Sequence, residues 1–341
     1  MKAAIIQRPG VIVVGEAPKP VIQPGEALIR VRYNGICGTD VHLLHGNHPT
    51  MKMPLIPGHE IVGEVEEVSG KGAERFQTGD VVVAQELITC GICDACAKGS
   101  DNVCRELQII GIHADGGLAQ YVRVMTHKMY ALPKDIDLRL AALVEPLAVA
   151  VHDVRKSGLK VGETALVIGG GPIGLLIAIV ARANGAGKVV IGEVNEYRRN
   201  YAKNLGFDVA DPLDPDAGEQ IRRLGGGCGF DVSFEAAGAD SSIAACIEHT
   251  KNTGTIVAIA MTKGPVPVDT GKIFAKELTI VGVRVHSHYN FIGAVNMVKS
   301  GLYNDVLMGL VSRIYPLDQT ARAFEDAEKN KECFKVLIEI N

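Results

Sequence analysis

Short apolar runs bounded by turn-forming residues fill the first 85 positions of the chain. The runs at residues 3–6, 26–33, 61–68 and 80–84 are rich in Val and Ile, and Gly, Pro or Asp residues flank them. Runs of this composition and length predict β-strands. The pattern therefore predicts a β-rich domain, a small barrel or folded sheet, at the start of the chain.

From residue 162 the pattern changes to apolar strands that alternate with helical stretches. Strands are predicted at residues 164–168, 188–191, 230–234, 255–259 and 278–282, and helices at 175–183, 217–224 and 241–251. This alternation predicts an α/β domain built on a doubly wound parallel sheet of about six strands. A further helix is predicted at residues 290–301, and the chain then returns to mixed strand and helix.

The loop between the first of these strands and its helix is rich in glycine. It reads Gly169-Gly-Gly171-Pro172-Ile173-Gly174. In a dinucleotide-binding loop the first glycine permits the tight turn, the second lets a pyrophosphate approach the backbone, and the third packs helix against strand. The N-terminus of the helix then faces the phosphates. Because a strand precedes the loop and a helix follows it, the prediction of a dinucleotide site is specific.

Glu193 follows the second strand, 24 residues after Gly169. An acid at this distance accepts hydrogen bonds from the adenosine ribose hydroxyls, and its charge repels a 2′-phosphate. The sequence therefore predicts NAD rather than NADP. Arg198 is a further candidate for cofactor binding, because a nearby Arg can serve NADP. A solvated helix face is nevertheless the expected place of Arg198 and Arg199.

A candidate metal site lies earlier in the chain. Cys37 and His59 offer a thiolate and an imidazole, which zinc prefers, and Glu60 offers a third ligand or a supporting carboxylate. Thr39 carries a hydroxyl that can pass on a proton, and His42 titrates near neutral pH. Ligands from different loops beside acid–base groups indicate a catalytic metal more than a structural one. The alternative is a buried cysteine beside an ordinary core histidine.

A second group of candidate ligands consists of Cys90, Cys93, Cys96 and Cys104. Four thiolates at this spacing can enclose one tetrahedral zinc and leave no open position for chemistry. The rival is an iron–sulfur cluster. In the common bacterial cluster motif three residues separate the last two cysteines and a proline follows, whereas here seven residues separate them and Arg105 follows. The spacing therefore predicts a structural zinc.

Glu145 stands among apolar residues and precedes Pro146, which is expected to begin a helix. A carboxylate buried in such surroundings must be paired or bound to a metal, because burying it alone is costly. Glu145 is therefore a further candidate ligand.

Composition limits the classes of function. A chain of 341 residues favours two domains. A net charge of −4, with no long basic run, argues against nucleic acid. The longest uncharged run, 164–181, contains the glycine loop, which argues against a membrane span. No signal peptide is expected, and a cysteine cluster without one favours metal binding in a reducing cytoplasm.

With these residues in place, the chain resembles the zinc-dependent medium-chain dehydrogenases over nearly its full length. The resemblance is carried by the motifs Gly35-Ile-Cys37-Gly-Thr39-Asp40-x-His42, Gly58-His59-Glu60-x2-Gly63 and Glu145-Pro146-Leu147, together with the four cysteines and the glycine loop. The chain looks like the sorbitol, threonine and sugar-acid branch, because Glu145-Pro146 stands where liver-type alcohol dehydrogenases carry a third cysteine ligand.

The resemblance implies a GroES-like catalytic domain interrupted by a Rossmann domain. The expected ranges are 1–153 for the GroES-like domain, with the cysteine lobe at about 88–106, then 154–288 for the NAD-binding domain and 289–341 for the return to the first. It also implies an active site in the cleft between the two domains and a homodimer or homotetramer. Two zinc ions per chain are expected, one catalytic and one structural, and either Glu60 or Glu145 is the third ligand of the catalytic ion.

The implied reaction is transfer of a hydride between NAD and a secondary alcohol of a polyol or sugar acid. Zinc lowers the pKa of the substrate hydroxyl, and Thr39 and His42 carry its proton to water. His113, in the loop after the cysteine lobe, and Arg284, just past the last predicted strand, are candidate substrate residues. A guanidinium at Arg284 that pairs with a carboxylate of the substrate would indicate that the substrate is an aldonate. Pairing of Arg284 with an acid at an interface is equally compatible with the sequence.

Three alternatives are open on the sequence alone. One is an NADP-dependent carbonyl or alcohol reductase on the same fold. A second is a non-catalytic regulatory protein that binds a dinucleotide or sugar, which the joint presence of Thr39, His42 and a full ligand set disfavours. The third, a zinc-ribbon protein that binds nucleic acid, is disfavoured by the acidic charge balance.

Overall fold

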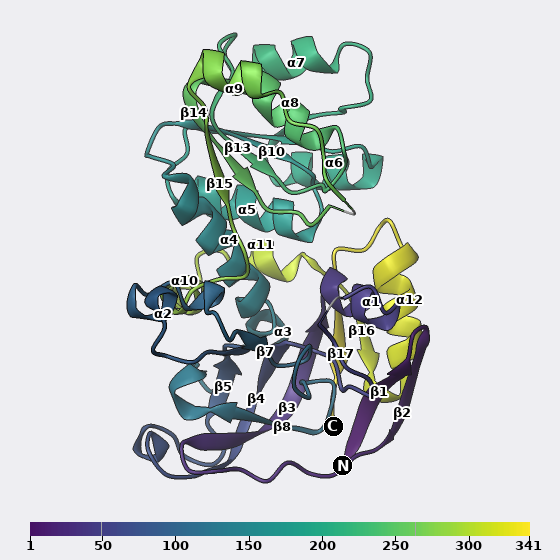
Figure 1. Cartoon of the computed structure of the whole chain (residues 1–341). Coiled ribbons are helices and arrows are strands. Elements are labelled where there is room, and N and C mark those ends of the chain that lie inside the picture. Colours follow the sequence, from purple (N-terminus) through teal and green to yellow (C-terminus); the bar gives the residue numbers. More distant parts are fainter. Residues whose placement is uncertain (49, 263) are drawn as a thin grey trace. The chain divides into compact units, whose positions relative to one another are not determined.

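The computed structural model describes residues 1–48, 50–262 and 264–341, which form two compact units (Figure 1). Unit 1 contains Met1–Ala148 and Ser287–Asn341, and unit 2 contains Val149–His286. The limits expected from the sequence, after residues 153 and 288, lie five and two residues further along the chain. Helix α4 (Val144–Ser157) continues through the first limit, so no loop marks it in the sequence.

The centre of unit 1 is a seven-stranded sheet. Its strand order is β16-β17-β3-β4-β5-β9, and β8 also pairs with β3. The strands are β3 (Glu26–Ile36), β4 (Glu60–Val68), β5 (Val81–Ala84), β8 (Tyr121–Met125), β9 (Met129–Ala131), β16 (Val311–Pro316) and β17 (Lys335–Glu339). Buried Val, Ile and Ala side chains of these strands form the core, which confirms the predicted β-rich first domain.

Smaller elements complete unit 1. Two short pairs of strands are β1 (Lys2–Arg8) with β2 (Val11–Glu16) and β6 (Leu87–Ile88) with β7 (Gln108–Ile109). Its helices, besides the start of α4, are α1 (Gly38–Leu44), α2 (Asp94–Ala97), α3 (Leu138–Ala141), α10 (His288–Lys299), α11 (Asn304–Met308) and α12 (Thr320–Lys329). The predicted helix at 290–301 corresponds to α10.

Unit 2 is built on a six-stranded parallel sheet with the order β12-β11-β10-β13-β14-β15. The strands are β10 (Thr164–Ile168), β11 (Lys188–Gly192), β12 (Asp208–Ala210), β13 (Phe230–Glu235), β14 (Thr250–Ala258) and β15 (Thr279–Gly282). The order reverses next to β10, and ligands of such sheets bind at this switch point, beyond the carboxyl ends of the strands. The predicted doubly wound sheet is confirmed.

The helices of unit 2 are α5 (Pro172–Ala183), α6 (Glu196–Asn204), α7 (Ala217–Leu224), α8 (Ser242–His249) and α9 (Thr270–Lys276) (Figure 1). The prediction of a helix over 241–251 is wrong at its end, because β14 begins at Thr250. The Thr250 hydroxyl donates a hydrogen bond to the Cys246 carbonyl and lies 2.7 Å from the Ser233 hydroxyl, whose proton it can accept, which joins strand to helix. The three-residue strand β12 and helix α9 were not predicted, because short elements give weak periodicity.

Within the ranges that the structure describes, no helix has the length and apolar character needed to cross a membrane.

Asp153 on α4 is a buried acid whose two carboxylate oxygens have no hydrogen-bond partner among the described residues. Burial raises its pKa well above the ordinary value, and the charge of His286 lowers it only in part. A raised carboxyl pKa means that the folded state holds its proton more tightly than the unfolded state does. The free energy of unfolding therefore falls as the pH rises from the pKa of Asp153 in the unfolded chain, about 4, toward its higher pKa in the folded protein.

Replacing Asp153 by Asn removes this ionisation while keeping the shape of the side chain. We expect Asp153→Asn to leave the free energy of unfolding nearly unchanged at pH 4 and to raise it on the order of 1–2 kcal/mol at pH 8. Denaturant unfolding across this pH range measures the difference. Equal effects at both pH values would show that Asp153 does not titrate in this way.

Candidate functional site

The three predicted ligands Cys37, His59 and Glu60 lie together in unit 1. One ligand atom from each lies within 4.8 Å of the others. Adjacent strands bring them together: Cys37 directly follows β3, Glu60 begins β4, and the pairing of β3 with β4 sets Gly35 opposite Glu60. Gly35 is required for space, because a Cβ there would overlap Oε2 of Glu60. A thiolate, an imidazole and a carboxylate at this separation fit a zinc ion.

The carboxylate of Asp40 holds this cluster in place. Asp40 is fully buried; Oδ2 accepts a hydrogen bond of 2.9 Å from the backbone of Cys37, and Oδ1 accepts one of 3.3 Å from that of Gly58. Oδ1 also lies 3.4 Å from Nδ1 of His59, which leaves Nε2 to face a metal. Sequence analysis did not assign this role to Asp40. The signal was present, because Cys37 is the N-cap residue of helix α1 and an acidic side chain three positions after an N-cap is a known capping pattern.

Burial alone would lower the pKa of His59, but Asp40 and Cys37 outweigh this effect and raise the pKa well above its ordinary value. His59 thus lies between the carboxylate of Asp40 and the sulfur of Cys37, which both favour a proton on its ring. A zinc ion must displace its proton to bind, so metal binding and proton release are coupled at this site.

Lys335 on β17 is a second residue that sequence analysis missed. Its Nζ donates a hydrogen bond of 2.5 Å to Oε1 of Glu60 and one of 3.2 Å to the carbonyl of Ile36. Burial raises the pKa of Glu60, which Lys335 opposes and the charge of Glu145 reinforces. The second oxygen of Glu60, Oε2, is buried and has no hydrogen-bond partner in the described ranges. A buried lone pair of this kind is suited to a metal.

Glu145 lies on the first turn of α4 and is buried. Its carboxylate lies within 4.8 Å of that of Glu86, another buried acid that sequence analysis did not select. Of the two candidate third ligands, Glu60 is the one that the structure groups with Cys37 and His59. Glu145 acts on that group through its charge.

Thr39 and His42 both lie on helix α1, which begins at Gly38, directly after the ligand Cys37. Residues three apart in a helix share a face. Thr39 is half-buried near the ligand, and His42 is exposed. This arrangement suits the transfer of a proton from an enclosed site toward solvent.

The sulfur atoms of Cys90, Cys93, Cys96 and Cys104 all lie within 4.8 Å of one another, and Cys93 and Cys96 are 3.6 Å apart. Backbone hydrogen bonds at Arg105 and Cys96 lower the pKa of Cys93 to about 6. A cysteine with so low a pKa is ready to serve as a thiolate ligand. The cluster therefore fits the predicted structural zinc.

The cysteine lobe is tied to the sheet of unit 1 through Asp101. Its Oδ2 accepts a hydrogen bond of 2.9 Å from Nζ of Lys128, which also donates to Gln85. Oδ1 of Asp101 accepts a hydrogen bond of 3.3 Å from the backbone of His288, the first residue of α10. Because Lys128 and Gln85 are buried, this polar network fixes the base of the lobe.

In unit 2 the glycine loop directly follows β10 and leads into α5, whose first residue is Pro172. Gly169 has a φ of 107°, which favours glycine, and a Cβ there would lie 2.8 Å from the backbone of Ala236. A Cβ at Gly174 would overlap the carbonyl of Gly169. Both glycines are therefore needed for the turn, as predicted for a phosphate-binding loop.

Glu193 lies beside this loop. Its Oε2 accepts a hydrogen bond of 2.7 Å from the backbone of Gly170, and Oε1 accepts one of 2.7 Å from that of Asn195. The side chain of Glu193 is thus fixed next to the glycine loop before any ligand binds. A fixed carboxylate loses little entropy when it accepts further hydrogen bonds.

The two arginines of α6 differ in their surroundings. Nη1 of Arg198 lies 3.6 Å from the position that a Cβ on Gly171 would occupy, so Arg198 flanks the loop. The expectation of a solvated place is wrong for Arg199. Its guanidinium pairs with Asp211 at 3.0 Å, donates to the carbonyl of Glu193 and is only 17% exposed.

The two candidate substrate residues have different settings. His113 in unit 1 accepts a hydrogen bond from the backbone of Ile109, and its Nε2 lies 2.8 Å from Oγ1 of Thr50. Through these contacts His113 joins the loop that contains Thr50 to the segment at Ile109, which is a structural role. Arg284 in unit 2 is exposed on the segment that follows β15.

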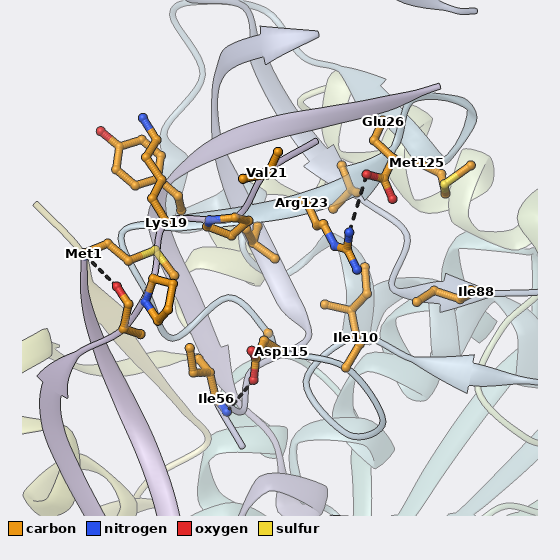
Figure 2. Close-up of a pocket in the computed structure, with 18 of the residues that line it drawn as sticks. Met1, Lys19, Val21, Glu26, Ile56, Ile88, Ile110, Asp115, Arg123 and Met125 are labelled. Carbon is orange, nitrogen blue, oxygen red and sulfur yellow. Dashed lines mark hydrogen bonds and ion pairs between the residues drawn. The ribbon is translucent and has the colours of Figure 1, made fainter. Parts of the chain in front are cut away.

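A cavity of about 750 Å³ also lies in unit 1, lined by residues 17–21, by β8 and by parts of 108–116 (Figure 2). Its lining includes Lys19, Glu26, Asp115 and Arg123, and Arg123 pairs with Glu26 at 3.7 Å. None of the predicted ligands or acid–base residues lines this cavity. It is therefore separate from the metal cluster.

Comparison with known proteins gives consistent results. Residues 23–134 match the alcohol dehydrogenase GroES-like domain, and residues 172–300 match the zinc-binding dehydrogenase family. The chain is 38% identical to a 2-dehydro-3-deoxy-L-galactonate 5-dehydrogenase of Pseudoalteromonas atlantica, over 97% of this chain and 95% of that protein. It is 33% identical to an L-galactonate-5-dehydrogenase of Escherichia coli, over 99% and 98% of the two chains.

Among solved structures, that of L-idonate 5-dehydrogenase from Escherichia coli is similar, with a TM-score of 0.91 and 27% identity over 99% of this chain and 97% of that one. The first family match contains the Cys37–His59–Glu60 cluster and the four lobe cysteines, and the second begins at Pro172 in the dinucleotide loop. With these relatives and this arrangement of ligands, the chain belongs to the zinc-dependent medium-chain dehydrogenases.

Proposed function

We propose that this dehydrogenase oxidises a secondary alcohol of a polyol or sugar acid with NAD, using one catalytic and one structural zinc ion per chain. The observation that carries the proposal is the convergence of Cys37, His59 and the unpartnered Oε2 of Glu60. Similar relatives act on galactonate derivatives and on sorbitol, which supports a polyhydroxylated substrate.

Each residue near the cluster has a distinct task in this reaction. A zinc ion bound by Cys37, His59 and Glu60 supplies Lewis-acid chemistry, which lowers the pKa of a substrate hydroxyl. Thr39 accepts the hydroxyl proton, and the exposed His42 on the same helix releases it to water. Asp40 holds the backbone of Cys37 and the ring of His59, so that the ligands need not reorganise during the reaction.

In unit 2, Gly169–Gly174 and the start of α5 receive the pyrophosphate of NAD, and Glu193 receives the adenosine ribose. Bound NAD supplies the hydride acceptor. A 2′-phosphate would meet the buried charge of Glu193, which favours NAD over NADP. Arg198 beside Gly171 is placed to interact with the same end of the cofactor.

We further propose a homodimer or homotetramer in a reducing cytoplasm. The strand β15 is an edge of the six-stranded sheet, and an open edge invites pairing with another chain. Apolar side chains are exposed on this strand and on the two segments before it: Ile280 on β15 is 40% exposed, Phe274 on α9 86% and Met261, in the loop after β14, 72%. A second copy would cover them. A reducing compartment keeps the four lobe cysteines available as thiolates.

Metal analysis tests the two zinc sites separately. Elemental analysis of the purified protein should find two zinc ions per chain. Cys37→Ser should leave one zinc and a folded protein without turnover, because the Cys37–His59–Glu60 site alone is damaged. Cys96→Ser should lower the melting temperature, because the lobe then lacks a complete ligand shell. A single zinc ion in the wild-type protein, or iron with visible colour, would contradict the assignment.

Steady-state kinetics with NAD and NADP tests the role of Glu193. The wild-type protein should strongly prefer NAD in kcat/KM, and Glu193→Ala should narrow the gap because the charge that repels a 2′-phosphate is gone. Glu196→Ala, on the exposed face of α6, serves as the control and should leave the preference intact. A wild-type preference for NADP would support the reductase on the same fold instead.

Substitution of Arg284 tests whether the substrate carries a carboxylate. If Arg284 binds a substrate carboxylate, aldonates should exceed the matching uncharged polyols in kcat/KM, and Arg284→Ala should erase this advantage at a cost of about 2 kcal/mol. A panel of polyols, aldonates and 3-hydroxy amino acids with NAD, followed through NADH absorbance, measures both effects. Polyols as the better substrates, with Arg284→Ala equally harmful to all, would assign Arg284 to the scaffold.

A further inference from the structure

Lys335 is a buried lysine that touches a zinc ligand. Its side chain is 6% exposed and that of its partner Glu60 is fully buried, and their Nζ and Oε1 atoms are 2.5 Å apart. A lysine is rarely buried unless it is paired, because removing its charge from water is costly. The proposed reaction assigns it no task, so its presence next to the metal ligands requires an explanation.

The sheet places this lysine with little freedom. Strand β17 runs antiparallel to β3, with Val336 opposite Ile36, while β4 lies on the other side of β3 with Glu60 opposite Gly35. Lys335 and Glu60 therefore reach each other across β3 at the point where it has glycine. The carbonyl of Ile36 accepts a second hydrogen bond from Nζ, which fixes the ammonium group from the backbone.

A metal ion at the cluster would bring a second cation to Glu60. The ammonium group of Lys335 already contacts Oε1 of this carboxylate. Cys37 and His59 place ligand atoms within 4.8 Å of a carboxylate oxygen of the same residue. Lys335 and the metal then share the same carboxylate.

The two oxygens of Glu60 are used differently. Oε1 accepts the hydrogen bond from Lys335, and Oε2 has no hydrogen-bond partner in the described ranges. An ammonium group that is hydrogen-bonded to one oxygen of a carboxylate withdraws electron density from the whole group. The other oxygen is then a weaker ligand for a metal ion. Mutation of the usual partners of metal ligands costs about 10- to 100-fold in metal affinity, because those partners raise the basicity of the ligand. Lys335 is a cation that lowers the basicity of Glu60, so its removal should act in the opposite direction by a similar factor.

We propose that Lys335 is a positioning residue that competes with the catalytic zinc for Glu60 and thereby keeps this ligand exchangeable. The inference rests on the proposed function of the Cys37–His59–Glu60 cluster. Lys335 retains Glu60 when the metal is absent, and it weakens the bond from Glu60 when the metal is present. The carboxylate of Glu60 can thus leave the metal when another oxygen ligand binds, and it can bind again when that ligand leaves.

The test compares Lys335→Met, which keeps the length of the side chain without its charge, with Lys335→Arg, which keeps the charge. Zinc release from the full-length zinc-loaded proteins to a chromogenic chelator should give two phases, and loss of the faster phase in Cys37→Ser would identify it as the ion of the Cys37–His59–Glu60 cluster. We expect this phase to be about 10- to 100-fold slower in Lys335→Met and close to the wild-type rate in Lys335→Arg. Lys251→Met removes a different lysine–carboxylate pair, with Asp231 in unit 2, and should not change the rate.

Melting temperatures provide the second readout. In Lys335→Met the metal-free protein should melt lower, because Glu60 is left buried without a partner, and zinc should raise the melting temperature more than in the wild type. An unchanged or faster release, with equal losses of melting temperature in the metal-free and zinc-loaded forms, would show that Lys335 serves the fold alone. A wild-type protein with zinc only in the lobe would instead overturn the proposed catalytic site.

Discussion

The burial of several acidic groups around Cys37 is the constraint on which unit 1 depends. Glu60, Glu86, Glu145 and Asp40 are all buried within this unit, and isolated charges in such surroundings are strongly destabilising. The fold answers two of these acids at the metal cluster: Asp40 with backbone N–H groups and His59, and Glu60 with Lys335. Oε2 of Glu60, which has no hydrogen-bond partner among the described residues, is suited to a divalent cation, so that the stability of the region and its chemistry have the same origin.

Much of this site could be predicted because its residues are close in sequence. Cys37, His59 and the four lobe cysteines have ligand chemistry that is recognisable from residue type and spacing, and the glycine loop is recognisable from the strand and helix around it. Lys335 could not be predicted in this way, since it lies 275 positions from Glu60 along the chain and meets it only in the folded sheet. Asp40 was predictable in principle through its capping pattern. The pairing of Arg199 with Asp211 depends on a tertiary contact that periodicity does not reveal.

The two ligand sites differ in how much they are formed in advance. In unit 2 the carboxylate of Glu193 is already bonded to Gly170 and Asn195, so that the fold has fixed one end of the dinucleotide site. In unit 1 the polar atoms of the metal cluster are held from outside by Asp40 and Lys335, while the oxygen Oε2 of Glu60 is left for a ligand. An active site is preorganised when neighbouring groups fix its ligand residues in place and leave one ligand atom available, as Asp40 and Lys335 do here.

The position of β17 in the chain has a consequence for how the protein is made. The strand that carries Lys335 pairs with β3 near the start of the chain, whereas all of unit 2 is encoded between them. During translation the ribosome therefore releases a complete Rossmann unit while β3 still has an open edge and Glu60 still lacks its cation. Chains fold as their domains emerge, so the catalytic sheet closes last. The edge of β3 that β17 covers therefore stays open from the synthesis of β3 until that of β17, and throughout this interval it can pair with an incorrect strand.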